Sequence, residues 1–172
     1  MMKFWVECRR FVFITLLCVA SFFLHSPDSH AREMQGRLGL GYNSQFANSS
    51  IGQRVPGVSI KYGFTRDIAF EAVAGISTAS PTNTVAGVKL FKNIFYETSL
   101  NFYFLLGGAM VSANSITGAQ FISGFGVEFF IPGIESLGFS VETGASLDNV
   151  SGSFALKTMG VSFLDAGIHF YF

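Results

Sequence analysis

The stretch Gly160–Phe172, GVSFLDAGIHFYF, alternates apolar residues with residues of another kind through its C-terminal part. The apolar positions are Leu164, Ala166, Ile168, Phe170 and Phe172. Asp165, Gly167, His169 and Tyr171 lie between them. A repeat of two residues places successive side chains on opposite faces of a β-strand. The stretch therefore predicts a strand with one apolar face and one face that carries Asp165 and His169.

The composition is unusual for a protein that folds in water. Charged residues make up 13% of the 172-residue chain, whereas an ordinary soluble domain has about 25%. The formal net charge is zero, so a nucleic-acid partner is not indicated. After the N-terminal segment, no apolar run approaches the roughly 20 residues that a membrane helix needs. This combination favours one domain that crosses a membrane as a β-barrel.

The N-terminal segment has the features of a secretory signal peptide. Lys3, Arg9 and Arg10 precede the apolar run Phe11–Leu24, and the small-residue end Ser29–Ala31 follows it. This order of basic, apolar and small residues predicts cleavage after position 31, which leaves a barrel domain over residues 32–172. An uncleaved membrane anchor is the alternative. Both cysteines lie in the segment, so we expect no disulfide in the mature protein.

The alternation continues along the rest of the chain and predicts eight strands. They are Gly36–Asn43, Gly57–Phe64, Ile68–Ser77, Thr84–Phe91, Phe95–Gly108, Ala119–Phe130, Leu137–Ala145 and Gly160–Phe172. Tight turns are expected at Thr65–Asp67, Lys92–Asn93 and Ile131–Ser136, and longer loops at Ser44–Val55, Thr78–Asn83, Val111–Gly118 and Leu147–Met159. Short turns on one side and longer loops on the other are typical of outer-membrane barrels. The predicted fold is all-β, a closed eight-stranded antiparallel up-and-down transmembrane β-barrel.

Each predicted strand carries one ionisable residue on its less apolar face. These residues are Arg37, Lys61, Glu71, Lys89, Glu97, Glu128, Glu142 and Asp165, and His169 shares the last strand's face. The remaining residues on these faces are mostly small. The interior of an eight-stranded barrel is just wide enough to be filled by side chains, and an unpaired buried charge is very unfavourable. We therefore expect the nine residues to form a paired structural network in the lumen.

The apolar face carries aromatic residues near both ends of the strands. Near the turns these are Tyr62, Phe64, Tyr96, Phe129, Phe139, Phe170 and Phe172, and near the loops Tyr42, Phe104 and Phe121. Two aromatic girdles mark the interfaces between a membrane barrel and its lipid. The alternation also fits a secreted soluble barrel of the lipocalin type, with the faces reversed. One charged residue per strand is, however, too few to cover a barrel in water.

These features resemble the small eight-stranded outer-membrane β-barrels of Gram-negative bacteria, the group of the OmpA membrane domain, OmpX and NspA. In these proteins a terminal Phe, with apolar residues two and four positions before it, is an assembly signal. The resemblance assigns this role to Leu164, Ala166, Ile168, Phe170 and Phe172. It implies an outer-membrane location, contact with outer-membrane lipids and lipopolysaccharide, and recognition by the barrel-assembly machinery. It identifies no external partner.

The sequence indicates a structural or surface-interaction protein and not an enzyme. A narrow channel for small solutes and a lipid A-modifying enzyme are the alternatives within the same architecture. His169 is the one histidine after position 31, and we expect it at the periplasmic end of the barrel without a serine arranged beside it. No cluster of His or Cys predicts a metal site, and we expect no cofactor.

Overall fold

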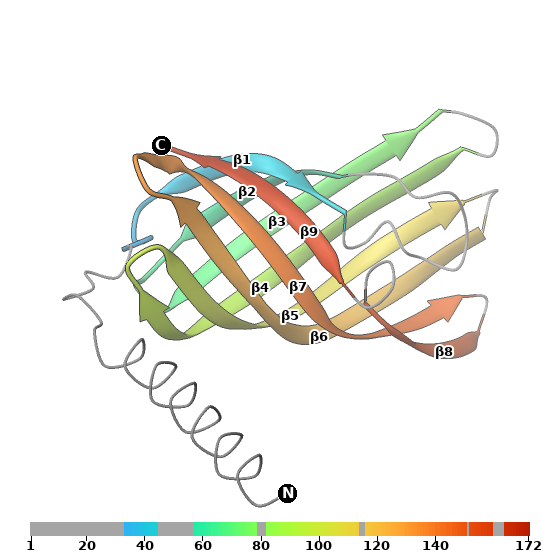
Figure 1. The fold of residues 1–172 in the computed structure, drawn as a ribbon. Coiled ribbons are helices and arrows are strands. Elements are labelled where there is room, and N and C mark those ends of the chain that lie inside the picture. The colour runs from blue at the N-terminus through green and yellow to red at the C-terminus, as the bar shows by residue number, and fades with distance from the viewer. Residues whose placement is uncertain (1–32, 45–56, 79–81, 114–115, 151, 160–163) are drawn as a thin grey trace, which may run out of the picture. The chain divides into compact units, whose positions relative to one another are not determined.

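Alternating side chains arrange the chain into one antiparallel sheet in the computed structural model (Figure 1), which describes residues 33–44, 57–78, 82–113, 116–150, 152–159 and 164–172. The strands are β1 (Leu38–Asn43), β2 (Gly57–Gly63), β3 (Ile68–Ser77), β4 (Asn83–Glu97), β5 (Leu100–Ala113), β6 (Ile116–Ile131), β7 (Ile134–Val150), β8 (Ser153–Thr158) and β9 (Asp165–Tyr171). No helix in these ranges has the length and apolar character to cross a membrane. The predicted signal peptide and strand residues 160–163 lie outside the described residues.

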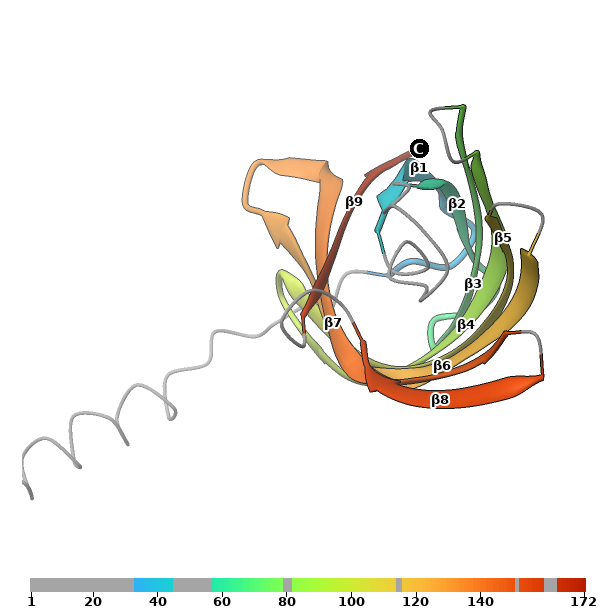
Figure 2. The same ribbon diagram turned by 90° about the vertical axis from the view of Figure 1, so that its right-hand side faces the viewer.

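The sheet closes on itself, because β1 pairs with β9 as well as with β2. β9 also pairs with the first part of β7, from Leu137 to Glu142, while β8 pairs with its later part, from Ala145 to Val150. β8 and β9 therefore lie one after the other along the same edge of β7 and together take the place of one strand. The nine strands thus form a closed sheet that is eight strands around (Figure 2). The predicted closed eight-stranded antiparallel barrel is confirmed.

Two of the predicted tight turns are present. Between β2 and β3, the hydroxyl of Thr65 accepts hydrogen bonds from the backbone N–H groups of Asp67 at 3.2 Å and Ile68 at 3.0 Å. Pro132 and Gly133 join β6 to β7. Gly133 has φ of +87°, a conformation that side chains with a Cβ rarely adopt.

The prediction of a turn at Lys92–Asn93 was wrong. β4 continues to Glu97, with a register shift between Asn93 and Phe95 where it pairs with β5. This bulge inserts one residue, so the inward and outward positions change places after Asn93. The chain turns at positions 98–99 instead, and Phe95–Glu97 belong to β4 and not to the predicted fifth strand.

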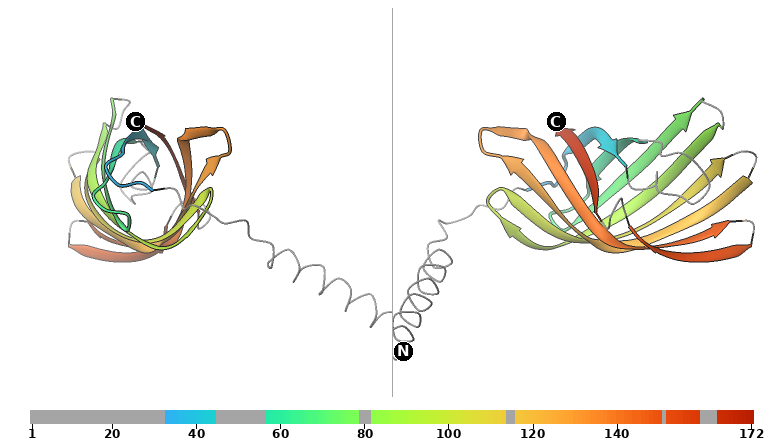
Figure 3. Two further views of the ribbon diagram at one scale, coloured as in Figure 1. Left: turned by 90° about the vertical axis from the view of Figure 1, so that its left-hand side faces the viewer. Right: turned by 45° about the vertical axis from the view of Figure 1, so that its right-hand side comes forward.

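The predicted loops Val111–Gly118 and Leu147–Met159 were also wrong, because both regions are largely strand. β5 runs to Ala113 and β6 begins at Ile116, while β7 runs to Val150 and is followed directly by the hairpin strand β8. Their Ser, Thr, Asn and Gly residues suggested loops, but backbone pairing across each hairpin satisfies the main chain there. Figure 3 shows these hairpins and the β3–β4 hairpin extending at the same end of the barrel. Positions 45–56 and 79–81 of the other two predicted loops lie outside the described residues.

The two faces of the sheet differ sharply. Large apolar side chains cover the outside, where the exposed fraction ranges from 37% for Tyr62 to 77% for Leu156. The lumen contains the charged residues and also an apolar cluster that was not expected. This cluster consists of Ala69, Val73, Val85, Phe91, Tyr103, Leu105, Ala109, Val111, Ile122 and Met159. Large side chains therefore fill part of the lumen that the sequence suggested would hold mostly small ones.

Candidate functional site

The centre of the lumen is occupied by ion pairs that cross from one wall to the other. Lys61 on β2, Glu71 on β3 and Lys89 on β4 lie in register on neighbouring strands. Glu128 on β6 and Glu142 on β7 face them from the opposite wall. The two lysines are long enough to reach across, so each pairs with a carboxylate far away in sequence. Across the first wall the charge therefore alternates from strand to strand, with the carboxylate of Glu71 between the two lysines.

Lys89 is the most enclosed charge in this network. Its Nζ lies 3.0 Å from Oε2 of Glu142 and 3.3 Å from Oε2 of Glu71, and the lysine side chain has no solvent exposure. The hydroxyl of Tyr103 donates a 2.8 Å hydrogen bond to Oε1 of Glu142. Burial of ions is favourable only when such partners replace the lost water. This group therefore forms one interdependent unit.

Lys61 forms a second pair closer to the turn end of the barrel. Its Nζ donates a 2.9 Å hydrogen bond to Oε2 of Glu128, whose other oxygen accepts a hydrogen bond from the hydroxyl of Tyr171. The ammonium also lies 4.5 Å from the centre of the Phe91 ring, a distance at which a cation is attracted to an aromatic face. A cavity of about 10 Å³ lies beside this pair, which is room for roughly one water molecule.

His169 lies within the network, and a serine is arranged beside it, contrary to expectation. Its Nε2 is 2.8 Å from Oγ of Ser59 and 3.4 Å from Oε1 of Glu71. Gly41 lies in register between Ser59 on β2 and His169 on β9, and a Cβ at this position would overlap the backbone of Ile168, so glycine allows β9 to lie this close to β1. A catalytic triad uses one ring nitrogen for the serine and the other for the carboxylate. Here both contacts fall on Nε2, so the geometry is that of a buried polar contact.

A third group lies towards the loop end. Asp148 accepts a 2.9 Å hydrogen bond from the side-chain amide of Gln120 and pairs with Lys157 at 3.0 Å. Asp165, at the start of β9, is also buried and accepts a hydrogen bond from the hydroxyl of Ser44. Sequence reasoning missed Asp148 and Lys157 because it placed both in a loop. Residues that pair across a two-residue turn are an odd number of positions apart, as Val150 and Ser153 are. The odd separation of Asp148 and Lys157 was therefore the signal that they share one face of a hairpin.

The structure places one of the nine predicted lumen residues on the surface and another at the turn end of the lumen. Glu97 is exposed at the end of β4, because the bulge after Asn93 reverses the side on which it projects. Arg37 is only partly buried and precedes β1, with its guanidinium carbon 5.9 Å from the centre of the Tyr171 ring. The remaining seven are buried: Lys61, Glu71, Lys89, Glu128, Glu142, Asp165 and His169.

The predicted assembly residues all lie on the outer face of the last strand region. Leu164, Ala166, Ile168, Phe170 and Phe172 are exposed. The rings of Phe170 and Phe172 meet edge to face with centroids 5.1 Å apart. Phe129 and Phe139 stack nearby in the chain's sixth and seventh strands, with centroids 5.4 Å apart. These two aromatic pairs therefore lie on the outer surface at the turn end of the barrel.

A separate charged group lies outside the lumen, at the β2–β3 turn. Asp67 Oδ2 lies 2.6 Å from Nζ of Lys92, and Asp67 Oδ1 lies 2.5 Å from the hydroxyl of Tyr96. The hydrogen bonds from Lys92 and then from Tyr96 lower the pKa of the Asp67 carboxyl below its ordinary value of 3.8. Sequence reasoning missed this group because it ended the strand before Tyr96.

Among the residues that the structure describes, no three His, Cys, Asp or Glu side chains come together in a way that could hold a metal ion. The charged groups of the lumen are instead matched mainly by one another and by tyrosine, serine and amide side chains. Each lysine of this arrangement lies beside at least one carboxylate, and the side chains together fill the interior.

Comparison with known proteins finds similarity to solved structures only. No family model matches the sequence. No curated protein matches it either. The chain is similar to the N-terminal β-barrel domain of OprF from Pseudomonas aeruginosa, with 18% identity over 79% of this chain and 96% of that chain and a TM-score of 0.49. The strand pairing itself establishes that this chain is a closed antiparallel β-barrel.

Proposed function

We propose that the protein is an integral β-barrel of a Gram-negative outer membrane, with a structural or surface-interaction role and a lumen closed by its charged network. Residues 1–31 act as the signal peptide that directs export and is then removed, and residues 32–172 form the barrel. Outer-membrane lipid and lipopolysaccharide surround it. The C-terminal strand is the part that the barrel-assembly machinery recognises.

The observation that carries this proposal is the inverted distribution of side chains. Lys89 has 0% and Glu71 1% relative exposure, whereas Leu156 has 77% and Phe154 70%. Hydrophobic burial drives folding in water, so a soluble barrel of lipocalin type would place these side chains the other way round. In a lipid bilayer, an apolar outer band around a polar interior is the stable arrangement.

The filled lumen favours a structural role over a conducting one. Lys89, Glu71, Glu142 and Tyr103 meet at the centre of the barrel, where all four are almost completely buried. An ion would have to displace these pairs in order to pass. The proposal predicts no steady conductance in planar bilayers, and discrete, reproducible channels would favour the solute-conduit alternative.

Heat-modifiable gel migration tests the barrel and its membrane environment. The protein is extracted from membranes of expressing cells in detergent and run with and without boiling. We expect the unboiled sample to migrate faster, because a closed barrel stays compact in detergent. A protein that remains soluble without detergent and shows no shift would contradict the proposal and favour a secreted ligand-binding barrel.

The assembly role of the last strand is tested in cells. We expect Phe172→Ala to reduce the amount of protein in the outer membrane. Phe129→Ala is the matched control, because Phe129 is an exposed aromatic residue near the same end of the barrel. Equal losses for the two variants would contradict a specific signal at Phe172.

Mass spectrometry of lipid A from the same cells tests the enzymatic alternative, for which we expect no modification.

A further inference from the structure

The short segment that precedes β1 inserts one apolar side chain into the turn end of the lumen. Met34 is 5% exposed, although its neighbours Glu33 and Gln35 are both exposed. It belongs to a cluster of buried apolar side chains with Phe130 and Tyr171. A thioether is flexible and polarisable and packs favourably against aromatic rings. The burial of Met34 therefore separates it from the polar residues on either side of it.

The backbone of this segment is held against the end of β2. The N–H of Gly36 donates a 2.8 Å hydrogen bond to the carbonyl oxygen of Gly63, and the N–H of Gly63 donates one of 3.2 Å to that of Arg37. The N–H of Arg37 donates a 3.1 Å hydrogen bond to the carbonyl oxygen of Met34, which closes a tight turn. Gly36, the third residue of this turn, has φ of +75°, a conformation that favours glycine.

The close approach of the segment requires glycine at position 63. A Cβ built at Gly63 would lie 2.0 Å from the carbonyl oxygen of Met34, which is far inside the contact distance of two atoms. Because the obstacle is backbone, rotation of a side chain could not relieve the overlap. A side chain at position 63 would therefore displace the segment from the lumen.

The aromatic rings of this cluster are themselves held in place. The Tyr171 ring lies over glycines on both neighbouring strands, because a Cβ at Gly39 or Gly138 would come within 2.6 Å or 2.9 Å of it. Its hydroxyl donates a hydrogen bond to Glu128. The centre of the Phe130 ring lies 5.9 Å from that of Tyr171. The segment thus packs against a surface that is fixed from several strands.

The ion pair nearest to this segment is shielded, although it lies towards the turn end. Met34 lines the same cavity of about 10 Å³ as Lys61 and Glu128. The side chains of this pair are only 6% and 3% exposed. An ion pair at an open end would be hydrated and screened by water. The burial of the pair therefore requires a cover at the turn end, and Met34 is part of that cover.

We propose that residues 33–37 form a plug that seals the turn end of the lumen, with the side chain of Met34 as its stopper. The inference rests on the proposed function, in which the lumen is closed, and adds a second closure at the periplasmic end. Its contacts are apolar and main-chain, so it does not depend on the charged network. The proposed cleavage after position 31 leaves only Arg32 and Glu33 in front of Met34. The plug is then the N-terminus of the mature protein.

Cysteine accessibility measures whether the plug closes the lumen. Cys8 and Cys18 are replaced by alanine, so that the chain has no thiol of its own. Ala69→Cys places a reporter beside the plug, in register with Gly63 and on the wall of the same cavity. Ala109→Cys places a matched reporter in the lumen towards the loop end. The two alanines have similar exposed fractions, 6% and 8%.

Protein purified from membranes in detergent is treated with a small methanethiosulfonate that carries a permanent charge and labels thiols that water can reach. Mass spectrometry follows the labelling. With the plug intact, both reporters should react slowly. We expect Met34→Ala to raise the labelling rate at position 69 at least about tenfold, because loss of a buried apolar side chain makes local opening easier. Gly63→Ala should have the same effect by displacing the backbone of the segment, and neither variant should change the rate at position 109.

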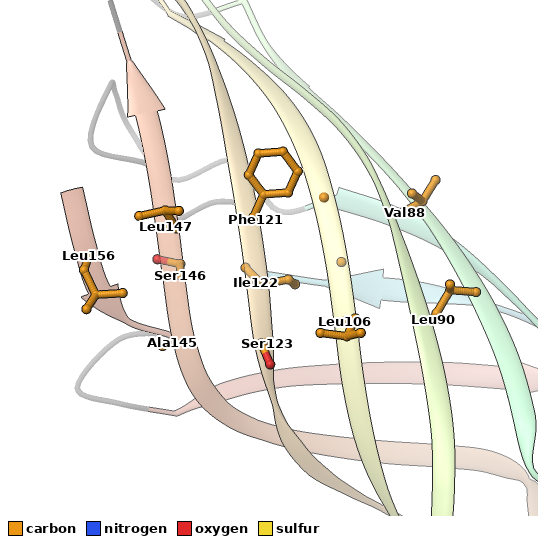
Figure 4. A pocket seen from close by; sticks show the side chains of 12 residues that line it. Val88, Leu90, Leu106, Phe121, Ile122, Ser123, Ala145, Ser146, Leu147 and Leu156 are labelled. Carbon is orange, nitrogen blue, oxygen red and sulfur yellow. The ribbon is translucent and has the colours of Figure 1, made fainter. Parts of the chain in front are cut away.

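Gly108→Ala is the control for the replacement of a glycine. Gly108, Ser123 and Ala145 form the floor of an apolar groove of about 560 Å³ on the outer face of β4–β8 (Figure 4). A Cβ at Gly108 would lie 3.6 Å from the Phe121 ring, an ordinary contact. This variant adds a methyl group outside the lumen and should leave both labelling rates unchanged.

Two outcomes overturn the inference. An unchanged rate at position 69 in both Met34→Ala and Gly63→Ala would show that the segment does not close the lumen. An equal rise at positions 69 and 109 would show a loosened barrel and not an opened end. Absence of heat-modifiable migration in the unaltered protein would instead count against the membrane function. The plug fails while that migration is retained, so the two failures are distinguishable.

Discussion

Lys89 and Lys92 are three residues apart on β4, and each forms an ion pair with a carboxylate, yet their surroundings are opposite. Lys89 lies in the lumen, where its side chain and that of Glu142 are 0% and 1% exposed. Lys92 lies on the outer surface at the turn end, where its side chain and that of Asp67 are 56% and 47% exposed. An odd separation along a strand places the two on opposite faces.

The comparison extends to a tyrosine on each side. Tyr103 hydrogen-bonds Glu142 in the lumen, and the hydroxyl of Tyr96 lies beside Asp67 at the surface. A lysine, a carboxylate and a tyrosine thus come together twice in this protein, once in the lumen and once at the surface. Water screens the outer group and replaces any partner that is removed, whereas the inner group has only its own members. Burial, and not the number of contacts, should decide how strongly each group stabilises the barrel.

The largest expected effect is that of Lys89→Met. Removing this lysine leaves Glu71 and Glu142 buried without their common cation, which should lower the free energy of unfolding by about 3–5 kcal/mol. Urea titration of the protein in lipid vesicles, with the folded fraction read from gel migration, measures the change. Lys92→Met is the control and should fall within the error of the method. Similar losses for the two variants would contradict the comparison.

The second pair should show a smaller loss and a partial rescue. Lys61→Met leaves Glu128 buried without its cation, but the cavity of about 10 Å³ beside the pair can admit one water molecule. We therefore expect a loss of free energy of unfolding of about 3 kcal/mol, at the lower end of the range for a broken buried pair. The double variant Lys61→Met/Glu128→Met should be more stable than Lys61→Met. If the two losses simply add, the coupling between these side chains is disproved.

A single hydroxyl should have an intermediate effect. Tyr103→Phe removes the hydrogen bond to the buried carboxylate of Glu142, which should cost about 1.5–3 kcal/mol. Tyr96→Phe removes the matching hydroxyl beside exposed Asp67 and should leave the urea midpoint unchanged. The same vesicle titration compares the two. A larger loss for the surface variant would reverse the expected order.

The smallest effect is the pH dependence of the surface group. The pKa of Asp67 is lowered from 3.8 by hydrogen bonds from Lys92 and Tyr96. A carboxyl with a lowered folded-state pKa stabilises the fold above its unfolded-state pKa and loses that contribution as pH falls through the lowered value. NMR titration should therefore give Asp67 a pKa below 3.8, and Tyr96→Phe should raise it towards that value. An Asp67 pKa at or above 3.8 in the unmodified protein would contradict the observed contacts.

The alternation of residues, together with the low content of charged residues, was sufficient to predict which face of most strands looks inward. Lys61, Glu71 and Glu142 are buried where the period of two places them, because a strand's geometry follows directly from its backbone. Glu97 was misplaced because one inserted residue at a bulge reverses the period, and a bulge has no clear mark in the sequence. Loop residues and strand residues of the long hairpins also have similar compositions. The lengths of those strands therefore could not be predicted.

The partners of the charged groups could not be predicted either. Lys61 and Glu128 are 67 residues apart in sequence, and their meeting depends on how the barrel closes and on the stagger of its strands. The contact between Ser59 and His169 lies where β9 closes on β1 at Gly41, whose lack of a Cβ allows the two backbones to approach, and a single sequence offers no sign of this role. Local patterns carry no information about which positions face one another across a lumen.

By itself, the sequence determined that the chain forms strands with one apolar and one polar face, because that property follows from the local period of two, and its low content of charged residues favoured a barrel with the apolar face outside. Only the tertiary structure decided how the interior is paired, where β4 reverses its faces at the bulge, and how β8 and β9 share one position. It also decided that Gly108, Ser123 and Ala145 lie together as the floor of an outer groove. Each of these depends on the register between strands, which is fixed only when the sheet closes.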